Sequence, residues 1–197
     1  MRLGDIRHWV FDMDGTLTVA VHDFPAIKVA LDIPPEDDIL THLAALPADE
    51  AAAKHAWLLE HERQLALESQ AAPGAVELVR ELAARGHRLG ILTRNARELA
   101  HVTLQAIGLA DCFAVADVLG REDAPPKPDP GGLLKLAQAW DVAPPTMVMV
   151  GDYRFDLDCG RAAGARTVLV NLADNPWPEL TDWHAEDCRA LQRMLAG

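Results

Sequence analysis

Hydrophobic and polar residues form their clearest pattern near the start of the chain. A short apolar run over 6–11 predicts a buried β-strand. Two acids one residue apart, Asp12 and Asp14, follow this run, and Gly15 and Thr16 come next. Buried carboxylates need a cation, hydrogen bonds or a shifted pKa, and glycine allows a sharp turn or a close approach to a ligand. The pattern therefore indicates a functional loop at a strand end, although Asp and Gly also occur in ordinary turns.

From residue 73 onward, stretches with helical spacing alternate with short apolar runs. The spacing predicts helices over 75–85, 96–107 and 131–140, a short helix that ends at 163, and a terminal helix near 186–195. Strands are predicted over 87–92, 112–116, 146–150 and 166–170. Strands that alternate with helices are typical of an α/β fold with a doubly wound parallel sheet.

The interval between the first strand and Pro73 differs, because helix-forming residues fill most of it. A helix start is expected near 34–38, where two prolines precede three acids, and a long helix is expected over 47–69. This interval is too long for a simple crossover between neighbouring strands. We therefore expect an α/β core formed by residues 1–18 and 73–197, with a small helical cap inserted at 19–72.

Composition and charge exclude several functions. The chain has 197 residues, enough for one core with a smaller insertion, and a formal net charge of −12. This charge argues against non-specific binding to nucleic acids or anionic membranes, and no apolar run is long enough to cross a bilayer. The three cysteines lack metal-ligand spacing, and the first residues lack the apolar region of a signal peptide. We expect a cytoplasmic protein, as a monomer or homodimer.

Polar side chains that could carry chemistry follow the predicted strands. In a doubly wound sheet the ligand site lies beyond the carboxyl ends of the strands. Six side chains are expected in or beside that region: Asp12, Asp14, Thr93, Lys127, Asp152 and Asp156. Singly, the threonine and the two later acids could cap helices, and the lysine could be a solvated loop charge. Their joint occurrence in this order favours a common site.

These residue types suit phosphoryl transfer. Three carboxylates and backbone oxygens favour a hard divalent cation such as Mg²⁺. Asp12 is a candidate nucleophile that would form an aspartyl-phosphate, and Asp14 would protonate the leaving alcohol and then activate water. Thr93, at the start of a helix, and Lys127 would hold the phosphoryl oxygens. The lysine and the cation would also offset negative charge in the transition state.

Four motifs extend the comparison to nearly the whole chain: FDMDGTL at 11–17, ILTRN at 91–95, PKPDP at 126–130 and GDYRFDLDCGRAAGA at 151–165. On these motifs the chain resembles the haloacid dehalogenase superfamily, in its phosphatase branch. The resemblance implies a Rossmann-like core, with Asp12 as nucleophile and Asp14 as general acid and base. It implies Mg²⁺ held by the Asp12 carboxylate, the backbone oxygen of Asp14 and Asp152, with Asp156 in support of the metal water or of Lys127. We also expect Arg94 to bind the substrate phosphate together with Thr93 and Lys127. The inserted helices resemble a C1-type cap, as in phosphoglycolate phosphatase-like members, but the cap is shorter.

The second acid, Asp14, separates branches of this superfamily. True dehalogenases lack it, and phosphonate hydrolases resemble the chain less for the same reason. Phosphonate hydrolases also use a cap lysine as a Schiff base, which Lys28 or Lys54 could mimic. Sugar phosphomutases similar to β-phosphoglucomutase share all four motifs and stay open as an alternative. A catalytically idle member that serves as a binding protein is a further alternative, against which the intact motif residues weigh.

The leading expectation is a Mg²⁺-dependent phosphatase that hydrolyses a small phosphorylated metabolite. Its specificity is expected to depend on cap residues and on residues beside the core motifs, with four candidates: His22, Arg63, Arg94 and Arg154. An arginine that faces the pocket would indicate a carboxylate or a second phosphate on the substrate. Each candidate is more simply interpreted as a solvated or ion-paired side chain.

Overall fold

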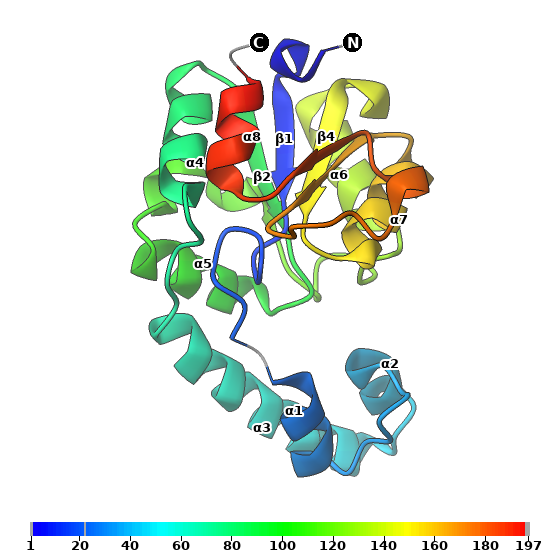
Figure 1. Ribbon diagram of the computed structural model, residues 1–197. Helices are drawn as coiled ribbons and strands as arrows, with labels where there is room; N and C mark the ends of the chain where they lie inside the picture. The colour runs from blue at the N-terminus through cyan, green and yellow to red at the C-terminus, as the bar shows by residue number, and fades with distance from the viewer. Residues whose placement is uncertain (1, 22, 196–197) are drawn as a thin grey trace.

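A central parallel sheet organises the computed structural model, which describes residues 2–21 and 23–195 (Figure 1). Within these residues, six strands are hydrogen-bonded in the order β3-β2-β1-β4-β5-β6, and every pairing is parallel. The strands are β1 (His8–Phe11), β2 (Arg88–Leu92), β3 (Val118–Leu119), β4 (Met147–Gly151), β5 (Arg166–Val170) and β6 (Trp183–Ala185). The chain starts in the middle of the sheet, builds one edge through β2 and β3, and returns to build the other. The predicted doubly wound α/β fold is confirmed.

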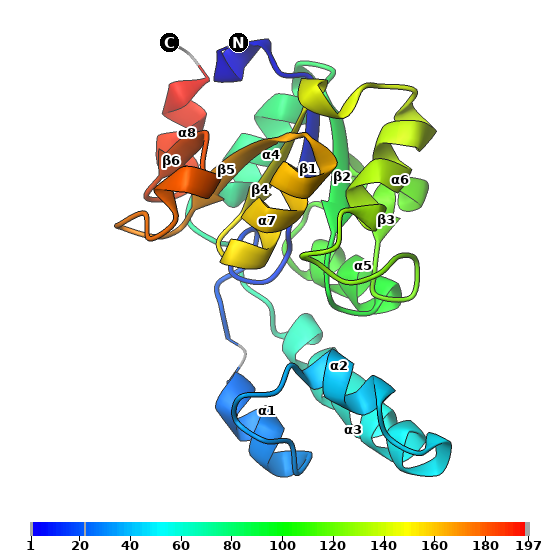
Figure 2. The same ribbon diagram turned by 90° about the vertical axis from the view of Figure 1, so that its right-hand side faces the viewer.

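Helices cover both faces of this sheet (Figures 1 and 2). They are α4 (Ala75–Ala84), α5 (Arg97–Ala106), α6 (Gly131–Trp140), α7 (Arg154–Ala163) and α8 (Cys188–Met194). Because alternate strand residues point to opposite faces, Trp9 and Phe11 pack in the apolar core that includes α4, α5 and α8. Val10 packs on the other face, with α6 and α7. All three side chains are fully buried, so β1 is covered on both faces.

The inserted segment forms a separate group of helices beyond the carboxyl ends of the strands (Figures 1 and 2). These are α1 (Phe24–Ala30), α2 (Ile39–Ala44) and α3 (Ala48–Leu67). They share an apolar cluster of their own, which contains Ile27, Leu43 and Leu58. The two connections to the core run side by side, since the Val19 N–H donates to the Gln70 carbonyl at 2.9 Å. The division of the chain at 18/19 and 72/73 stays a prediction.

The helix expected to start near 34–38 begins later. Residues 35–37 form turns and bends, and the helix begins at Ile39. The Asp38 carboxylate accepts the Thr41 N–H at 3.0 Å, which caps the helix at that point. The acids before Asp38 therefore belong to the connecting loop and not to the first helical turn.

The edges of the sheet also differ from the prediction. The strand expected over 112–116 is found at Val118–Leu119, because Val115–Asp117 forms a 3₁₀-helix. The edge strand β6 was not predicted, since three residues are too few to show strand periodicity. The remaining 3₁₀-helices are Leu3–Asp5, Ala110–Cys112, Pro144–Thr146 and Pro178–Leu180. In the part of the chain that the structure describes, every helix is too short or too polar to cross a membrane.

Candidate active site

The loop after β1 turns sharply to bring two acids to the carboxyl edge of the sheet. The N–H groups of Leu17 and Thr18 both donate to the Met13 carbonyl, at 2.9 and 3.1 Å. Gly15 has a φ of +85°, and a Cβ atom there would lie 2.4 Å from Oδ2 of Asp152. Only glycine therefore lets this turn approach the carboxylate that follows β4.

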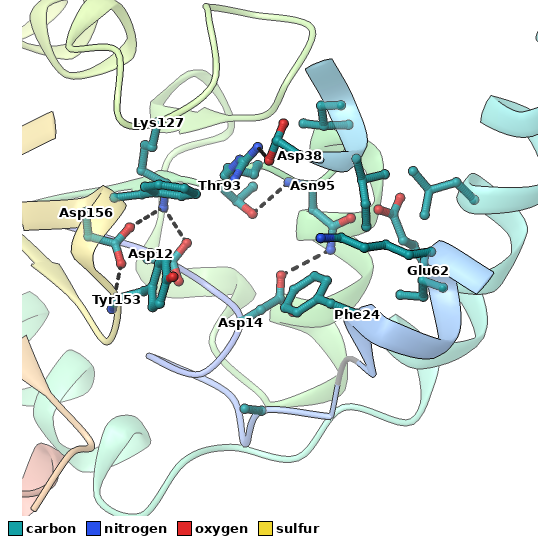
Figure 3. Close-up of a pocket in the computed structure, with 18 of the residues that line it drawn as sticks. Asp12, Asp14, Phe24, Asp38, Glu62, Thr93, Asn95, Lys127, Tyr153 and Asp156 are labelled. Atoms are coloured by element: carbon teal, nitrogen blue, oxygen red, sulfur yellow. Dashed lines mark hydrogen bonds and ion pairs between the residues drawn. The ribbon is translucent and has the colours of Figure 1, made fainter. Parts of the chain in front are cut away.

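Lys127 lies between two carboxylates at the floor of the site (Figure 3). Its Nζ is 2.5 Å from Oδ1 of Asp12 and 2.7 Å from Oδ1 of Asp156, and the residue is only 3% exposed. Burial by itself would lower the pKa of Lys127, but the charges of the two aspartates outweigh it and hold the pKa above its usual range. The lysine is therefore a fixed cation beside the candidate nucleophile.

Three carboxylates converge beside this lysine. Oxygens of Asp12, Asp152 and Asp156 all lie within 4.8 Å of one another. Burial, followed by the charges of the other two acids, raises the pKa of Asp152 to about 7. Burial also raises the pKa of Asp156, to about 6, although the Lys127 charge opposes the shift. Crowded carboxylates of this kind, two of them buried and one half-buried, fit a divalent cation, which would offset their repulsion.

Thr16 links the first two of these acids. Its hydroxyl lies 3.0 Å from Oδ1 of Asp152 and 3.3 Å from Oδ2 of Asp12, and the residue is fully buried. A hydroxyl has one hydrogen, so it can donate to only one carboxylate at a time. Thr16 thus helps to set the spacing of the two carboxylates.

Asp14 is held by a neighbour that the sequence reasoning did not single out. The side-chain amide of Asn95 donates to Oδ2 of Asp14 at 3.1 Å (Figure 3). Asn95 is oriented in turn by Thr93, whose hydroxyl accepts the Asn95 N–H at 3.0 Å. Asn95 is part of the ILTRN motif, and its place after a strand end was the signal that could have identified it.

These groups line a pocket of about 590 Å³ (Figure 3). The core supplies its polar floor, which includes Asp12, Asp14, Thr93, Lys127, Asp152 and Asp156. The helical insertion supplies much of the opposite wall, including Phe24, Ile27 and Leu58. The structure therefore brings all six motif side chains predicted from the sequence to one pocket.

The candidate specificity residues have different positions. Arg94 lines the pocket, and one terminal nitrogen lies 2.5 Å from Oδ2 of Asp38, at the start of α2. Arg63 is ion-paired with Glu98 at 2.6 Å, and Arg154 with its helix neighbour Asp158 at 3.2 Å. Neither Arg63 nor Arg154 is among the described residues that line the pocket. His22 lies outside the described residues.

Asn171 is a further residue that the sequence reasoning missed. Its side-chain amide donates to the backbone oxygens of Gly15 at 2.7 Å and Thr16 at 2.9 Å, and it has a φ of +63°. It directly follows β5, so the rule that sites lie at strand ends was a signal for it as well. Asn171 thereby fixes the loop that carries Asp12 and Asp14.

Comparison with known proteins supports a family assignment. The family model of haloacid dehalogenase-like hydrolases matches residues 6–164. A haloacid dehalogenase-like hydrolase domain-containing protein of Arabidopsis thaliana is 33% identical, over 88% of this chain and 74% of that protein. A phosphoglycolate phosphatase of Rhodospirillum rubrum is 31% identical, over 82% of this chain and 78% of that protein.

Solved structures give the same picture at the level of the fold. The crystal structure of a hydrolase from Pseudomonas syringae has a TM-score of 0.80 at 23% identity, and the match covers 97% of this chain and 98% of that one. The family model also spans most of the chain, including the loops that bear Asp12, Lys127 and Asp152. The protein therefore belongs to the haloacid dehalogenase-like hydrolase family.

Proposed function

We propose that the protein is a Mg²⁺-dependent phosphatase that hydrolyses a small phosphorylated metabolite, a phosphate monoester, through an aspartyl-phosphate intermediate. The observation that carries this proposal is the setting of Asp12. Its carboxylate lies 2.5 Å from the Lys127 ammonium and in a cluster with the half-buried Asp152 and the buried Asp156. The phosphoglycolate phosphatase of Rhodospirillum rubrum supports the reaction class by its name.

In the first step a carboxylate oxygen of Asp12 attacks phosphorus, and the bond from phosphorus to the alcohol oxygen breaks. Asp14, in its protonated form, gives its proton to the departing alcohol. Lys127 offsets the negative charge that gathers between the carboxylate and the phosphoryl group. The Thr93 hydroxyl accepts the Asn95 N–H, so its own hydrogen is left to bind a phosphoryl oxygen.

In the second step the roles of the two acids change. Asp14, now a carboxylate, takes a proton from a water molecule, whose oxygen attacks the phosphorus of the aspartyl-phosphate. The bond between phosphorus and Asp12 breaks, which releases inorganic phosphate and restores the free carboxylate. The Asn95 amide at 3.1 Å keeps Asp14 oriented through both steps.

Asp12, Asp152 and the backbone oxygen of Asp14 are the groups that would hold Mg²⁺, with Asp156 in support. The carboxylate cluster fits a divalent ion, since the raised pKa values of Asp152 and Asp156 indicate crowded negative charge. When bound, the ion supplies positive charge that offsets the negative charge on the phosphoryl oxygens in the transition state. Asp156 meanwhile accepts from the Tyr153 N–H at 3.1 Å, which fixes its second oxygen.

Phosphate release from a panel of phosphorylated metabolites, with Mg²⁺ or with EDTA, tests the proposal. We expect release with Mg²⁺ only, and Asp12→Asn should reduce it by roughly 10³-fold or more while the thermal midpoint stays near that of the parent. Asp158→Asn is the matched control, because Asp158 pairs with Arg154 and is not a described lining residue. Full activity in Asp12→Asn would remove Asp12 from the mechanism.

The same assay separates the other hypotheses. A sugar phosphomutase would convert a hexose 1-phosphate into its isomer with little phosphate release. A catalytically idle binding protein would leave every ester intact with Mg²⁺ present. Either result would contradict the proposed phosphatase reaction.

A further inference from the structure

The charged residues that line the pocket outside the six motif side chains have an unusual balance of charge. They are Glu36, Asp37, Asp38, Glu62, Lys28 and Arg94. We call these residues the leaving-group wall, because in the proposed reaction the alcohol part of the ester would face them. The set holds four carboxylates and two cations. A negatively charged group on the leaving alcohol could therefore bind only if Lys28 or Arg94 were free to pair with it.

Arg94 is already engaged by a carboxylate from the inserted helices. Its terminal nitrogen lies 2.5 Å from Oδ2 of Asp38, and its guanidinium carbon lies 5.0 Å from the centre of the Phe155 ring. The Nε atom is buried and has no hydrogen-bond partner among the described residues. An incoming anion would therefore have to compete with Asp38 for this arginine.

Asp38 is itself firmly held in the position that binds Arg94. Its Oδ1 accepts the N–H and the hydroxyl of Thr41, at 3.0 and 2.9 Å, which leaves Oδ2 for the arginine. Burial by itself would raise the pKa of Asp38, but the bonds from Arg94 and Thr41 outweigh it, and the pKa lies below its usual value. The carboxylate is thus charged at neutral pH and keeps Arg94 neutralised.

The second cation of the wall is also engaged. Nζ of Lys28 donates to the backbone carbonyl of Pro35 at 2.6 Å. Asp37 lies 2.8 Å from His42, and Glu62 lies 3.0 Å from Arg121, so these acids meet partners behind the wall. Among the described residues of the leaving-group wall, each cation is therefore bound to an oxygen of the protein, and Glu36 adds a further carboxylate.

Two aromatic rings also line the pocket. Phe24 of α1 and Tyr153, next to α7, border it, and they are 55% and 53% exposed (Figure 3). Tyr153 packs edge-on against Phe155, with ring centres 5.2 Å apart. Exposed ring surface in a pocket favours the apolar part of a ligand.

We propose that the Asp38–Arg94 ion pair makes this enzyme select phosphate monoesters whose alcohol carries no carboxylate or second phosphate. The proposal rests on the phosphatase function proposed above and narrows its substrate class. Asp38 acts as a specificity residue because it occupies the one arginine of the described pocket lining. Without Asp38, Arg94 would be a ready site for an anionic group on the leaving alcohol.

The test compares two esters that differ in one group. Glycerol 3-phosphate carries a hydroxymethyl group where 3-phosphoglycerate carries a carboxylate. Each is measured as a competitor of 4-nitrophenyl phosphate hydrolysis, with Mg²⁺ and at fixed ionic strength. We expect the parent protein to bind glycerol 3-phosphate at least about tenfold more tightly than 3-phosphoglycerate.

The variant Asp38→Asn should lower the ratio of the affinity for glycerol 3-phosphate to that for 3-phosphoglycerate by about tenfold. The reason is that it frees Arg94, while asparagine still caps α2. Asp37→Asn is the matched control: it removes the same charge from the same wall without touching Arg94. It should change the ratio by less than about threefold. In the double variant Asp38→Asn/Arg94→Gln, the increase in affinity for 3-phosphoglycerate that is expected from Asp38→Asn alone should disappear.

Three outcomes would overturn the proposal. In the first, the parent protein binds both esters equally or prefers 3-phosphoglycerate. In the second, Asp38→Asn leaves the affinity ratio of the two esters unchanged. In the third, Asp37→Asn changes this ratio as much as Asp38→Asn does. Hydrolysis of 4-nitrophenyl phosphate in any of these cases would leave the phosphatase function intact. If that ester and the wider panel all stay intact, the phosphatase function fails, and this substrate class fails with it.

Discussion

Lys127 determines the charge balance at the reaction centre. It is the buried cation between Asp12 and Asp156, at 2.5 and 2.7 Å. A buried ion pair is a weak source of stability as a whole, but removing one partner leaves an uncompensated buried charge. The stability of the protein should therefore depend on this lysine in a way that changes with pH.

Lys127→Met should lower the free energy of unfolding by about 3–5 kcal/mol at pH 8 without metal. In the variant, the carboxylates that remain have folded-state pKa values above their unfolded values, since that of Asp156 is about 6 even with the lysine present. Such groups stabilise the fold when protonated, and this contribution is lost as the pH rises. The deficit should therefore be smaller at pH 5 than at pH 8.

Urea unfolding in EDTA at the two pH values measures this effect. Lys135→Met is the control, because Lys135 is exposed and donates to the Asp123 carbonyl at 3.0 Å. It should change stability by less than about 0.5 kcal/mol at either pH. A deficit for Lys127→Met that is equal at both pH values would contradict the charge argument.

The side-chain amide of Asn171 should also contribute to stability, because it holds the loop after β1. Asn171→Asp keeps the size and the tolerance for a positive φ, but it replaces two donors by acceptors that face the Gly15 and Thr16 carbonyls. We expect a loss of about 1–3 kcal/mol in unfolding free energy and a lower kcat. Asn171→Gly, which loses the bonds without repulsion, should fall between the parent and Asn171→Asp. Thermal unfolding and initial rates give both readouts.

At the scale of the element, the loop after β1 depends on one glycine. Gly15 and Gly164 share positive φ values, +85° and +78°. A Cβ at Gly15 would meet Asp152 at 2.4 Å, whereas a Cβ at Gly164 would meet no atom within 4 Å. The two positions therefore separate backbone strain from steric contact with the carboxylate cluster.

Gly15→Ala and Gly164→Ala should both lower the thermal midpoint, because each places alanine in the left-handed region at roughly 1–2 kcal/mol. Only Gly15→Ala should also displace Asp152 and weaken Mg²⁺ binding. Titration calorimetry with Mg²⁺ on both variants and the parent measures this. If Gly164→Ala weakened Mg²⁺ binding as much, the contact with Asp152 would not be the cause.

At the scale of the whole molecule, metal binding should be linked to protons. The pKa of Asp152 is about 7 in the metal-free protein, raised by burial and by the charges of Asp12 and Asp156. Below that pH a cation must displace a proton from the cluster, and above it the carboxylates are already charged. The apparent Mg²⁺ affinity should fall by up to about tenfold per pH unit below pH 7 and level off above it.

The rise of the thermal midpoint with Mg²⁺, measured from pH 5.5 to 8.5, follows this affinity. We expect the rise to grow with pH up to about 7 and then to change little, as Asp152 loses its proton in the metal-free protein. Asp152→Asn should remove most of the rise at every pH. A rise independent of pH in the parent protein would contradict the proton linkage.

Local sequence pattern determined the architecture of this protein and most of its reaction centre. Alternating strand and helix periodicity specifies a doubly wound sheet, and such a sheet collects the residues after each strand at one edge. Asp12, Thr93 and Asp152 could therefore be assigned to one pocket from their positions after predicted strands. Asn95 and Asn171 also follow strand ends. They were not predicted as site residues, because a neutral amide gave no separate indication of chemistry.

Only the tertiary structure decided which side chains meet across the pocket. Asp38 and Arg94 are 56 residues apart, and no periodicity of either segment relates them. Their contact depends on where the inserted helices lie over the strand ends, which is set by packing between distant segments. Periodicity records burial and local conformation, whereas a pairing of this kind arises from the folded chain as a whole. For that reason the sequence by itself determined most of the polar residues of the pocket, and the fold decided that Asp38 pairs with Arg94.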